Sequence, residues 1–279
     1  MEKNKELRVF AEEIRVETLK EIGHLGFGHI GGALSIVELL AVLYGGEMKI
    51  DPKNPQWEQR DRLVVSKGHS GPSVYATLAL KGYFDKEMLL TLNQGGTHLP
   101  SHCDRTKTPG IDMTTGSLGQ GMSTAIGLAM ASKIKKQDNY TYLVLGDGEC
   151  NEGQVWEGAA FAPHFKLDHL IAFVDLNKQQ LDGACDDILY MGDMVDKWTS
   201  FGWNTVKVNG HDLDAIKTAI ENAKKQQGKP SMIILDTVKG KGCELAEKTF
   251  PCHHMKFKAE DIAPSIEKAE AALEAARRA

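Results

Sequence analysis

Short apolar segments that predict strands alternate with longer helical patterns along most of the sequence. Glycine, asparagine or aspartate follows each short segment, and the alternation favours a mainly parallel α/β sheet with helices on both faces. The predicted strands are residues 62–66, 142–145, 170–175, 204–208 and 231–236, and the predicted helices are residues 6–23, 35–44, 72–81, 118–136, 153–165, 213–227 and 263–278. Without a repeat or a low-complexity linker, residues 1–279 are taken as one large domain.

Two segments lack a clear periodicity. Residues 93–116 are rich in glycine, threonine, proline and histidine, and residues 240–257 are similar. Long irregular segments inside a regular fold often carry function, so an ordered loop or a lid is expected at each.

Composition excludes several classes of protein. A net charge of −5 offers no basic surface for nucleic acid or anionic membranes. No apolar run approaches the roughly 20 residues that span a bilayer, and the charged amphipathic start has no signal-peptide pattern, which predicts a cytoplasmic protein. The five cysteines are odd in number and form no CxxC pair, so neither a disulfide framework nor a zinc site is indicated.

Asp147 stands between two glycines at the end of a predicted buried strand, and the next strand, LIAFVDLN, ends in Asn177. The 28 residues between Gly148 and Asn177 accommodate a helix and a return strand, which places the two side chains at neighbouring strand ends. Two such oxygen ligands and a backbone carbonyl suit Mg²⁺, and a helix starting near Gly153 would add its positive end. The alternative is a simple Gly-Asp-Gly turn with a strand-terminating asparagine.

The glycine-rich segment TTGSLGQG, residues 114–121, directly precedes a predicted helix. It could hold an anion or place its backbone against a flat ring, but glycines also serve a plain helix start. Neither a GxxxxGK[ST] loop nor a GxGxxG motif follows the strand that ends at Leu145, which counts against the common nucleotide-binding loops.

Histidines gather in the glycine-rich and irregular segments. His29, His69 and His102 lie in GFGHIGG, SKGHSGP and LPSHCDR, and His253 and His254 lie in the late segment. One such histidine is usually a structural hydrogen-bonding residue. Several in loops that converge on one end of a fold favour a polar site for hydroxyls and phosphates.

In this order, the motifs resemble the diphosphate-binding half of transketolase over nearly the whole chain. The match runs through the GH segment at His29, SKGH, TGSLGQG, GDGECNEG, FVDLNKQQLDG and KGKG. The resemblance implies a thiamine diphosphate-binding domain of the PP type.

The resemblance also implies roles for single residues. Asp147, Asn177 and the backbone carbonyl of Gln179 would hold Mg²⁺, or Ca²⁺ or Mn²⁺ in its place, against the diphosphate of thiamine diphosphate. Gly148 and His69 would touch that diphosphate. The aminopyrimidine ring would be lined by Gly116, Ser117 and Leu118, and Lys239 and His253 would face the cofactor and the sugar.

The family's catalytic groups have counterparts as well. His29, His69 and His102 would hydrogen-bond the hydroxyls of a ketose or aldose and shuttle protons. Glu152 matches a glutamate that lies at the subunit interface and communicates between two active sites. Its alternative role is that of an acidic residue favoured by the positive end of a helix.

The chain departs from the family pattern in three places. It stops at Ala279, before the pyrimidine-binding domain with its activating glutamate and before the C-terminal domain. This predicts the N-terminal subunit of a split transketolase, which works with a separate C-terminal subunit in an α2β2 assembly and binds the cofactor weakly by itself. Gly32 stands where some relatives have serine, and the usual WHG is CHH at residues 252–254, so His254 could take the place of His253.

Three hypotheses for function follow. The leading one is transfer of a two-carbon ketol unit from a ketose phosphate to an aldose phosphate. The second is the same chemistry on a branched or sulfonated sugar. The third is a non-catalytic cofactor-binding module, against which the retained histidines argue, because a mere binder would not need them.

Overall fold

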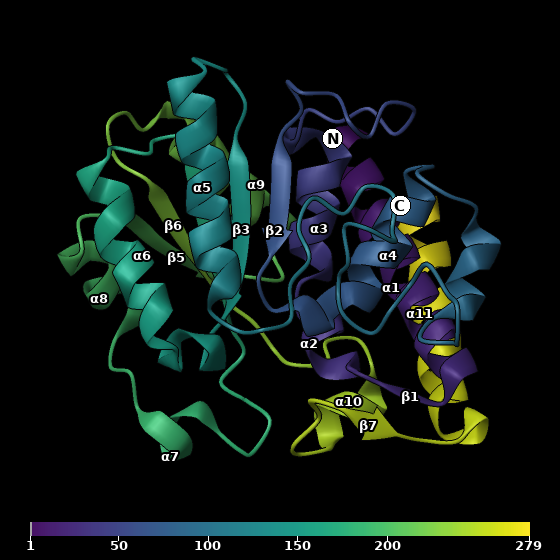
Figure 1. Ribbon diagram of the computed structural model, residues 1–279. Coiled ribbons are helices and arrows are strands. Elements are labelled where there is room, and N and C mark those ends of the chain that lie inside the picture. The colour runs from purple at the N-terminus through teal and green to yellow at the C-terminus, as the bar shows by residue number, and fades with distance from the viewer. Residues whose placement is uncertain (1) are drawn as a thin grey trace.

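A five-stranded sheet, parallel throughout, forms the centre of the protein in the computed structural model, which describes residues 2–279 (Figure 1). The strand order is β2-β3-β4-β6-β5. The strands are β2 (Arg62–Val65), β3 (Thr141–Gly146), β4 (Leu170–Leu176), β5 (Asn204–Asn209) and β6 (Ser231–Asp236). All five predicted strands are confirmed, each within one residue of its expected bounds.

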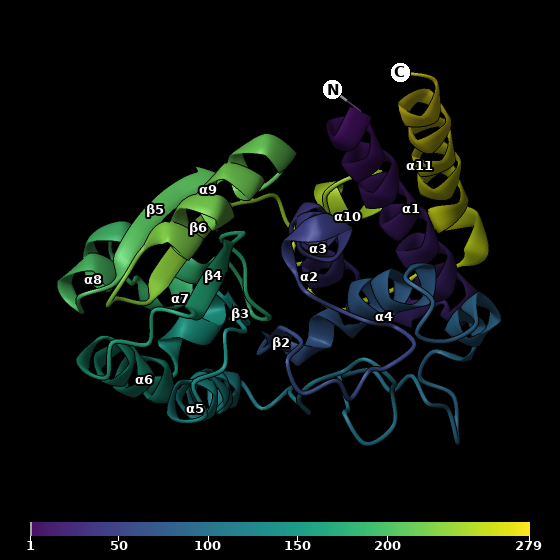
Figure 2. The same ribbon diagram turned by 90° about the horizontal axis from the view of Figure 1, so that it is seen from above.

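Helices cover both faces of the sheet, as predicted (Figures 1 and 2). Along β3, Tyr142 and Val144 enter one apolar core, whereas Leu143 and Leu145 enter the other. Because both faces are buried, the strand reads as a continuous apolar run. One layer contains α5 (Gln120–Ile134), α6 (Gly153–His164) and α8 (Met194–Ser200), and the other contains α1 (Glu2–Leu25), α3 (Val37–Val42), α4 (Gly71–Leu80) and α9 (Leu213–Lys225).

The two terminal helices pack side by side. Helix α1 lies along α11 (Ala259–Arg278), and both chain ends lie at the same side of the molecule (Figure 2). Within the described residues, no helix is long and apolar enough to cross a membrane.

The single helix predicted over residues 35–44 is wrong. The structure has α2 (Ile30–Leu34), then α3, and then a π-helical turn over Leu43–Glu47. The break falls at Ser35, whose hydroxyl donates to the buried Asp175 at 2.6 Å. A tertiary contact therefore interrupts a pattern that looks locally helical.

The segment 240–257 is more regular than expected. It contains α10 (Glu244–Lys248) and β7 (Met255–Lys256), and β7 pairs antiparallel with β1 (Phe27–Gly28). Neither strand was predicted, since two residues show no periodicity. The other irregular segment, residues 93–116, is confirmed as an ordered loop, with Cys103 N–H donating to the Gly68 carbonyl at 3.3 Å.

Candidate functional site

The carboxyl ends of β3 and β4 place Asp147 and Asn177 side by side, as the spacing predicts. Gly146 and Asp175 are partners in the parallel register, and the Asp147 N–H donates to the Asp175 carbonyl at 3.2 Å. The residues at these strand ends are called the charged floor here, and its members are Lys67, Asp147, Asp175, Asn177 and Lys239.

Asp147 is a buried carboxylate whose charge is poorly compensated. Its side chain is held by backbone donors alone: Gly148 N–H at 2.8 Å to one oxygen and Lys178 N–H to the other. Burial and the negative charge of Asp175 raise its pKa to about 6, although the two hydrogen bonds and Lys239 oppose the rise. With only 3% of the residue exposed, such a carboxylate favours a bound cation.

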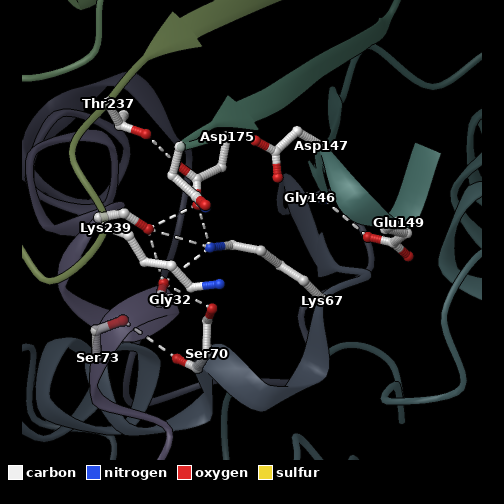
Figure 3. Close-up of polar contacts among 12 residues, drawn as sticks. Gly32, Lys67, Ser70, Ser73, Gly146, Asp147, Glu149, Asp175, Thr237 and Lys239 are labelled. Carbon is white, nitrogen blue, oxygen red and sulfur yellow. Dashed lines mark hydrogen bonds and ion pairs between the residues drawn. The ribbon is translucent and has the colours of Figure 1, made fainter. Parts of the chain in front are cut away.

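Asp175 is the residue beneath the floor that the sequence analysis missed. Its carboxylate receives Lys67 Nζ at 2.6 Å, Ser35 Oγ at 2.6 Å, Asn177 Nδ2 at 2.7 Å and Thr237 Oγ1 at 2.5 Å (Figure 3). Burial would raise the pKa of Asp175, but the charge of Lys67 and these hydrogen bonds outweigh it and lower the pKa. The one polar residue within the apolar run LIAFVDL was the available signal.

Neutral oxygens complete the donor set around Asp147. Since Asp175 holds the amide nitrogen of Asn177, the amide oxygen points the other way and accepts from Gln179 N–H at 3.1 Å. The Gln179 carbonyl accepts from Lys239 Nζ at 2.7 Å. In the described part of the chain, no three His, Cys, Asp or Glu side chains are grouped to hold a metal. A cation here would rest on one carboxylate, neutral oxygens and ligand oxygens, which suits a hard ion such as Mg²⁺.

A cavity of about 150 Å³ lies over the floor. A Cβ atom on Gly148 would stand 2.7 Å from the Cβ of Gln180, so only glycine fits where the backbone reaches the cavity wall. Eight of the predicted site residues line this space: His69, Leu118, Asp147, Gly148, Asn177, Gln179, Lys239 and His253.

Five histidines form a second group beside this cavity, called the histidine rim: His29, His69, His102, His253 and His254. The His29 ring lies 4.8 to 5.6 Å from the other four ring centroids. The β1–β7 pair creates this group, because one residue follows β1 and two precede β7. The structure thus brings together every predicted histidine.

His253 and His254 occupy different positions. His253 lies 4.5 Å from His69 between ring centroids, and its Nδ1 is 3.3 Å from Lys239 Nζ. His254 is exposed and packs against His29 and Phe27. His253 is therefore the one that lines the cavity.

The rim histidines are electrically neutral near pH 7. Burial, then His254, His102 and Lys239, lower the pKa of His29 to about 4. Burial and Lys239 lower the pKa of His253 to about 3, and the pKa values of His69 and His102 are lowered as well, chiefly by burial. These rings can donate and accept hydrogen bonds without adding positive charge.

The glycine-rich segment contributes unevenly. Gly116 lies against the His102 ring, and Leu118 reaches the cavity, while Ser117 is exposed. Gly116 and Leu118 therefore lie at the site, and Ser117 lies outside the cavity lining.

Glu149 is a second residue that the sequence analysis missed. Its buried carboxylate accepts from Gly119 N–H at 2.8 Å, from Gly146 N–H at 2.9 Å and from Ser66 Oγ. It therefore joins the glycine-rich segment to the ends of two strands. Its place within GDGE was the only signal in the sequence.

Glu152 lies apart from both the floor and the rim. It is exposed at the start of α6, against Gly119, and its side chain makes no capping hydrogen bond to the helix. The structure therefore places this residue on the surface beside the site.

Comparison with known proteins gives one consistent result. Residues 7–272 match the family model described as "Transketolase, thiamine diphosphate binding domain". A 6-deoxy-6-sulfo-D-fructose transketolase subunit of Clostridium sp. is 57% identical over 247 residues, which are 88% of this chain and 90% of that protein. One of the two apulose-4-phosphate transketolase subunits of Phocaeicola vulgatus is 37% identical over 248 residues, 89% of this chain and 88% of that one.

Solved structures agree with these relatives. A transketolase variant from Pichia stipitis in complex with fructose 6-phosphate superposes with a TM-score of 0.86 at 30% identity. The likeness covers 98% of this chain and 44% of that one, so this chain spans less than half of the solved enzyme. The Campylobacter jejuni transketolase gives a TM-score of 0.83 at 30% identity and covers 97% of this chain and 46% of its own.

Proposed function

The chain belongs to the transketolase family as a thiamine diphosphate-binding domain, and we propose that it is the N-terminal subunit of a two-chain enzyme that transfers a two-carbon ketol unit. The observation that carries this proposal is the pair Asp147 and Asn177 at neighbouring strand ends, facing the histidine rim across one cavity. A cation site beside neutral proton-transfer groups suits cleavage and formation of bonds next to a carbonyl.

The floor would hold Mg²⁺ and the diphosphate. Asp147, the Asn177 amide oxygen and the Gln179 carbonyl are the protein ligands of this proposal, and Ca²⁺ or Mn²⁺ could substitute. When bound, thiamine diphosphate supplies the electron sink that the reaction needs. Gly148 and His69 lie where the backbone and an imidazole can approach the diphosphate.

The rest of the cofactor would lie along the glycine-rich segment. Gly116, Ser117 and Leu118 would line the aminopyrimidine ring, and Lys239 would face the cofactor from the opposite wall. Leu118 and Lys239 both line the cavity, which supports this placement.

The rim would bind the sugar. As neutral rings, His29, His69 and His102 can accept a proton from a sugar hydroxyl at one nitrogen while donating from the other. Their lowered pKa values keep this acceptor available near neutral pH. His253, beside Lys239, would hold the sugar close to the cofactor.

A partner chain would complete the site. Helix α7 (Cys185–Leu189) buries none of its residues, and the segment around it exposes Leu181, Ile188, Leu189 and Tyr190. Leu181 also lines the cavity, so this apolar surface begins at the site itself. We propose that the C-terminal subunit covers it.

Self-association would involve α6. Glu152 is exposed at the start of this helix, and Phe161 and Phe165 are exposed farther along it. We propose that a second copy packs here, which brings two Glu152 side chains near each other in an α2β2 assembly.

The donor is proposed to be a ketose with a terminal anion. The relative at 57% identity is named for 6-deoxy-6-sulfo-D-fructose and the one at 37% for apulose 4-phosphate. The higher identity favours the sulfonated ketose as the first donor to test, with ketose phosphates next and an aldose phosphate as acceptor.

The test is co-expression with the protein from the neighbouring reading frame, followed by a ketol-transfer assay with thiamine diphosphate and Mg²⁺. We expect turnover of at least one donor, and its loss in Asp147→Ala. Asp236→Ala is the matched control, because Asp236 ends the neighbouring strand β6 but binds Lys178 and Lys207 outside the cavity. A folded, cofactor-loaded pair that turns over no ketose phosphate or sulfonate would contradict the proposal and favour a binding module.

A further inference from the structure

A second buried polar cluster lies behind the site, between α1, α3 and the turn before α9. Its members are Arg15, Glu38 and His211, whose side chains are 6%, 9% and 13% exposed. Arg15 pairs with one oxygen of Glu38, and His211 Nδ1 lies 3.0 Å from the other. The proposed chemistry uses none of these three residues, although burying such charges is costly.

Both ends of the cluster hold the same loop, residues 238–242. His211 Nε2 accepts from Val238 N–H at 2.9 Å, and Arg15 Nη1 donates to the Lys241 carbonyl at 2.5 Å. Lys239 lies between these two contacts. Since the Val238 residue is 46% exposed, its side chain anchors the loop poorly, and the polar contacts must fix the backbone.

The hydrogen bonds of His211 determine where its ring hydrogen lies. A nitrogen that accepts from a backbone N–H carries no hydrogen itself. Because Nε2 accepts from Val238, the hydrogen of the neutral ring is on Nδ1, where it donates to Glu38. The carboxylate therefore orients the imidazole, and the imidazole positions the loop.

Arg15 fits against the far end of the loop only because Gly242 has no side chain. A Cβ atom there would stand 2.6 Å from Arg15 Cδ, and the φ angle of +87° also favours glycine. In front of the loop, Lys239 Nζ reaches the Gln179 carbonyl at 2.7 Å. The backbone is thus held on both sides of the residue that enters the site.

We propose that Arg15, Glu38 and His211 are positioning residues that hold the 238–242 loop so that Lys239 stays in the site. The inference rests on the proposed function insofar as Lys239 faces the cofactor. The loop contacts themselves can be tested without turnover.

Two substitutions separate the two bonds of His211. In His211→Gln, the side-chain oxygen can take the place of Nε2 and accept from Val238. In His211→Asn, the shorter amide can take the place of Nδ1 and donate to Glu38, but it cannot reach Val238. A purely space-filling role would make both variants behave alike.

The first measurement is hydrogen exchange of the peptide that covers residues 238–242, in the full chain without cofactor. Loss of the Val238 bond in His211→Asn should speed exchange about tenfold, and His211→Gln should restore most of the protection. Equal exchange in both variants and the wild type would overturn the proposal. If His211→Asn unfolds throughout, Gly242→Ala replaces it, with the same rise expected in this peptide and none in β3 or β4.

The second measurement is the thiamine diphosphate dependence of the subunit pair. His211→Asn should raise the half-saturating cofactor concentration about tenfold with kcat changed less than about threefold, and His211→Gln should approach the wild type. A cofactor dependence that is the same in all three proteins would overturn the role of Lys239 positioning. If exchange changes as expected but the wild-type pair turns over no sugar, the proposed function fails while the loop contacts stand.

Discussion

The charged floor and the histidine rim face one cavity but are built in different ways. Floor residues follow directly after strands, so the register of the parallel sheet brings Asp147 and Asn177 together. Rim residues come from loops that are distant in sequence, and the short β1–β7 pair joins the first of them to the last. The floor is therefore a local consequence of the sheet, and the rim is a long-range one.

The two regions also differ in electrostatics. A carboxyl whose pKa is raised, such as Asp147, gives its full contribution to stability below its unfolded pKa and loses it as pH rises through about 6. A histidine whose pKa is lowered, such as His29, contributes fully above its unfolded pKa and loses this as pH falls through about 4. Floor and rim therefore limit the stability of the cofactor-free chain from opposite sides of the pH scale.

The largest expected effect breaks the floor at its ion pair. Lys67→Met leaves the fully buried Asp175 without its cationic partner, and we expect a loss of about 3–5 kcal/mol in the free energy of unfolding, measured by urea denaturation. Adding Asp175→Asn removes the stranded charge and should recover part of the loss. A loss below about 1 kcal/mol for Lys67→Met would show that the floor does not depend on this pair.

The next effect tests the floor's pH direction. Asp147→Asn removes the destabilised charge, so above pH 7 the cofactor-free variant should be more stable than the wild type by roughly 2–3 kcal/mol, with little difference at pH 4. Urea unfolding at both pH values measures it. Asp236→Asn, at the end of β6, should not show this gain, because the pKa of Asp236 is lowered by its bonds to Lys178 and Lys207. A gain that is equal at both pH values would contradict the assignment.

The smallest effect tests the rim. With His29→Asn and His253→Asn combined, the cofactor-free chain should lose about 1–2 kcal/mol less stability than the wild type between pH 7 and pH 4.5, because two sites that resist protonation are gone. Thermal unfolding across this range measures the difference. The exposed His98→Asn serves as the control, and an acid limb unchanged in the double variant would remove the rim from the explanation.

Much of the sheet and the floor could be predicted from the sequence. Strands buried on both faces read as continuous apolar runs, and successive parallel strands must end at the same edge, so the spacing of Asp147 and Asn177 sufficed. Resemblance to a family supplied the rim residues, whose single motifs are common in other contexts. Asp175 and Lys67 were missed because, inside or next to strands, they read as ordinary sequence until their partners are known.

Only the tertiary structure decided how the distant segments meet. It paired the two residues of β1 with the two of β7, and it placed His253 rather than His254 in the cavity lining. It also brought His211 to Glu38 and Val238. The physical reason is that hydrophobic periodicity reports which face of a single element is buried, whereas contacts between loops depend on how the elements pack and where the chain returns.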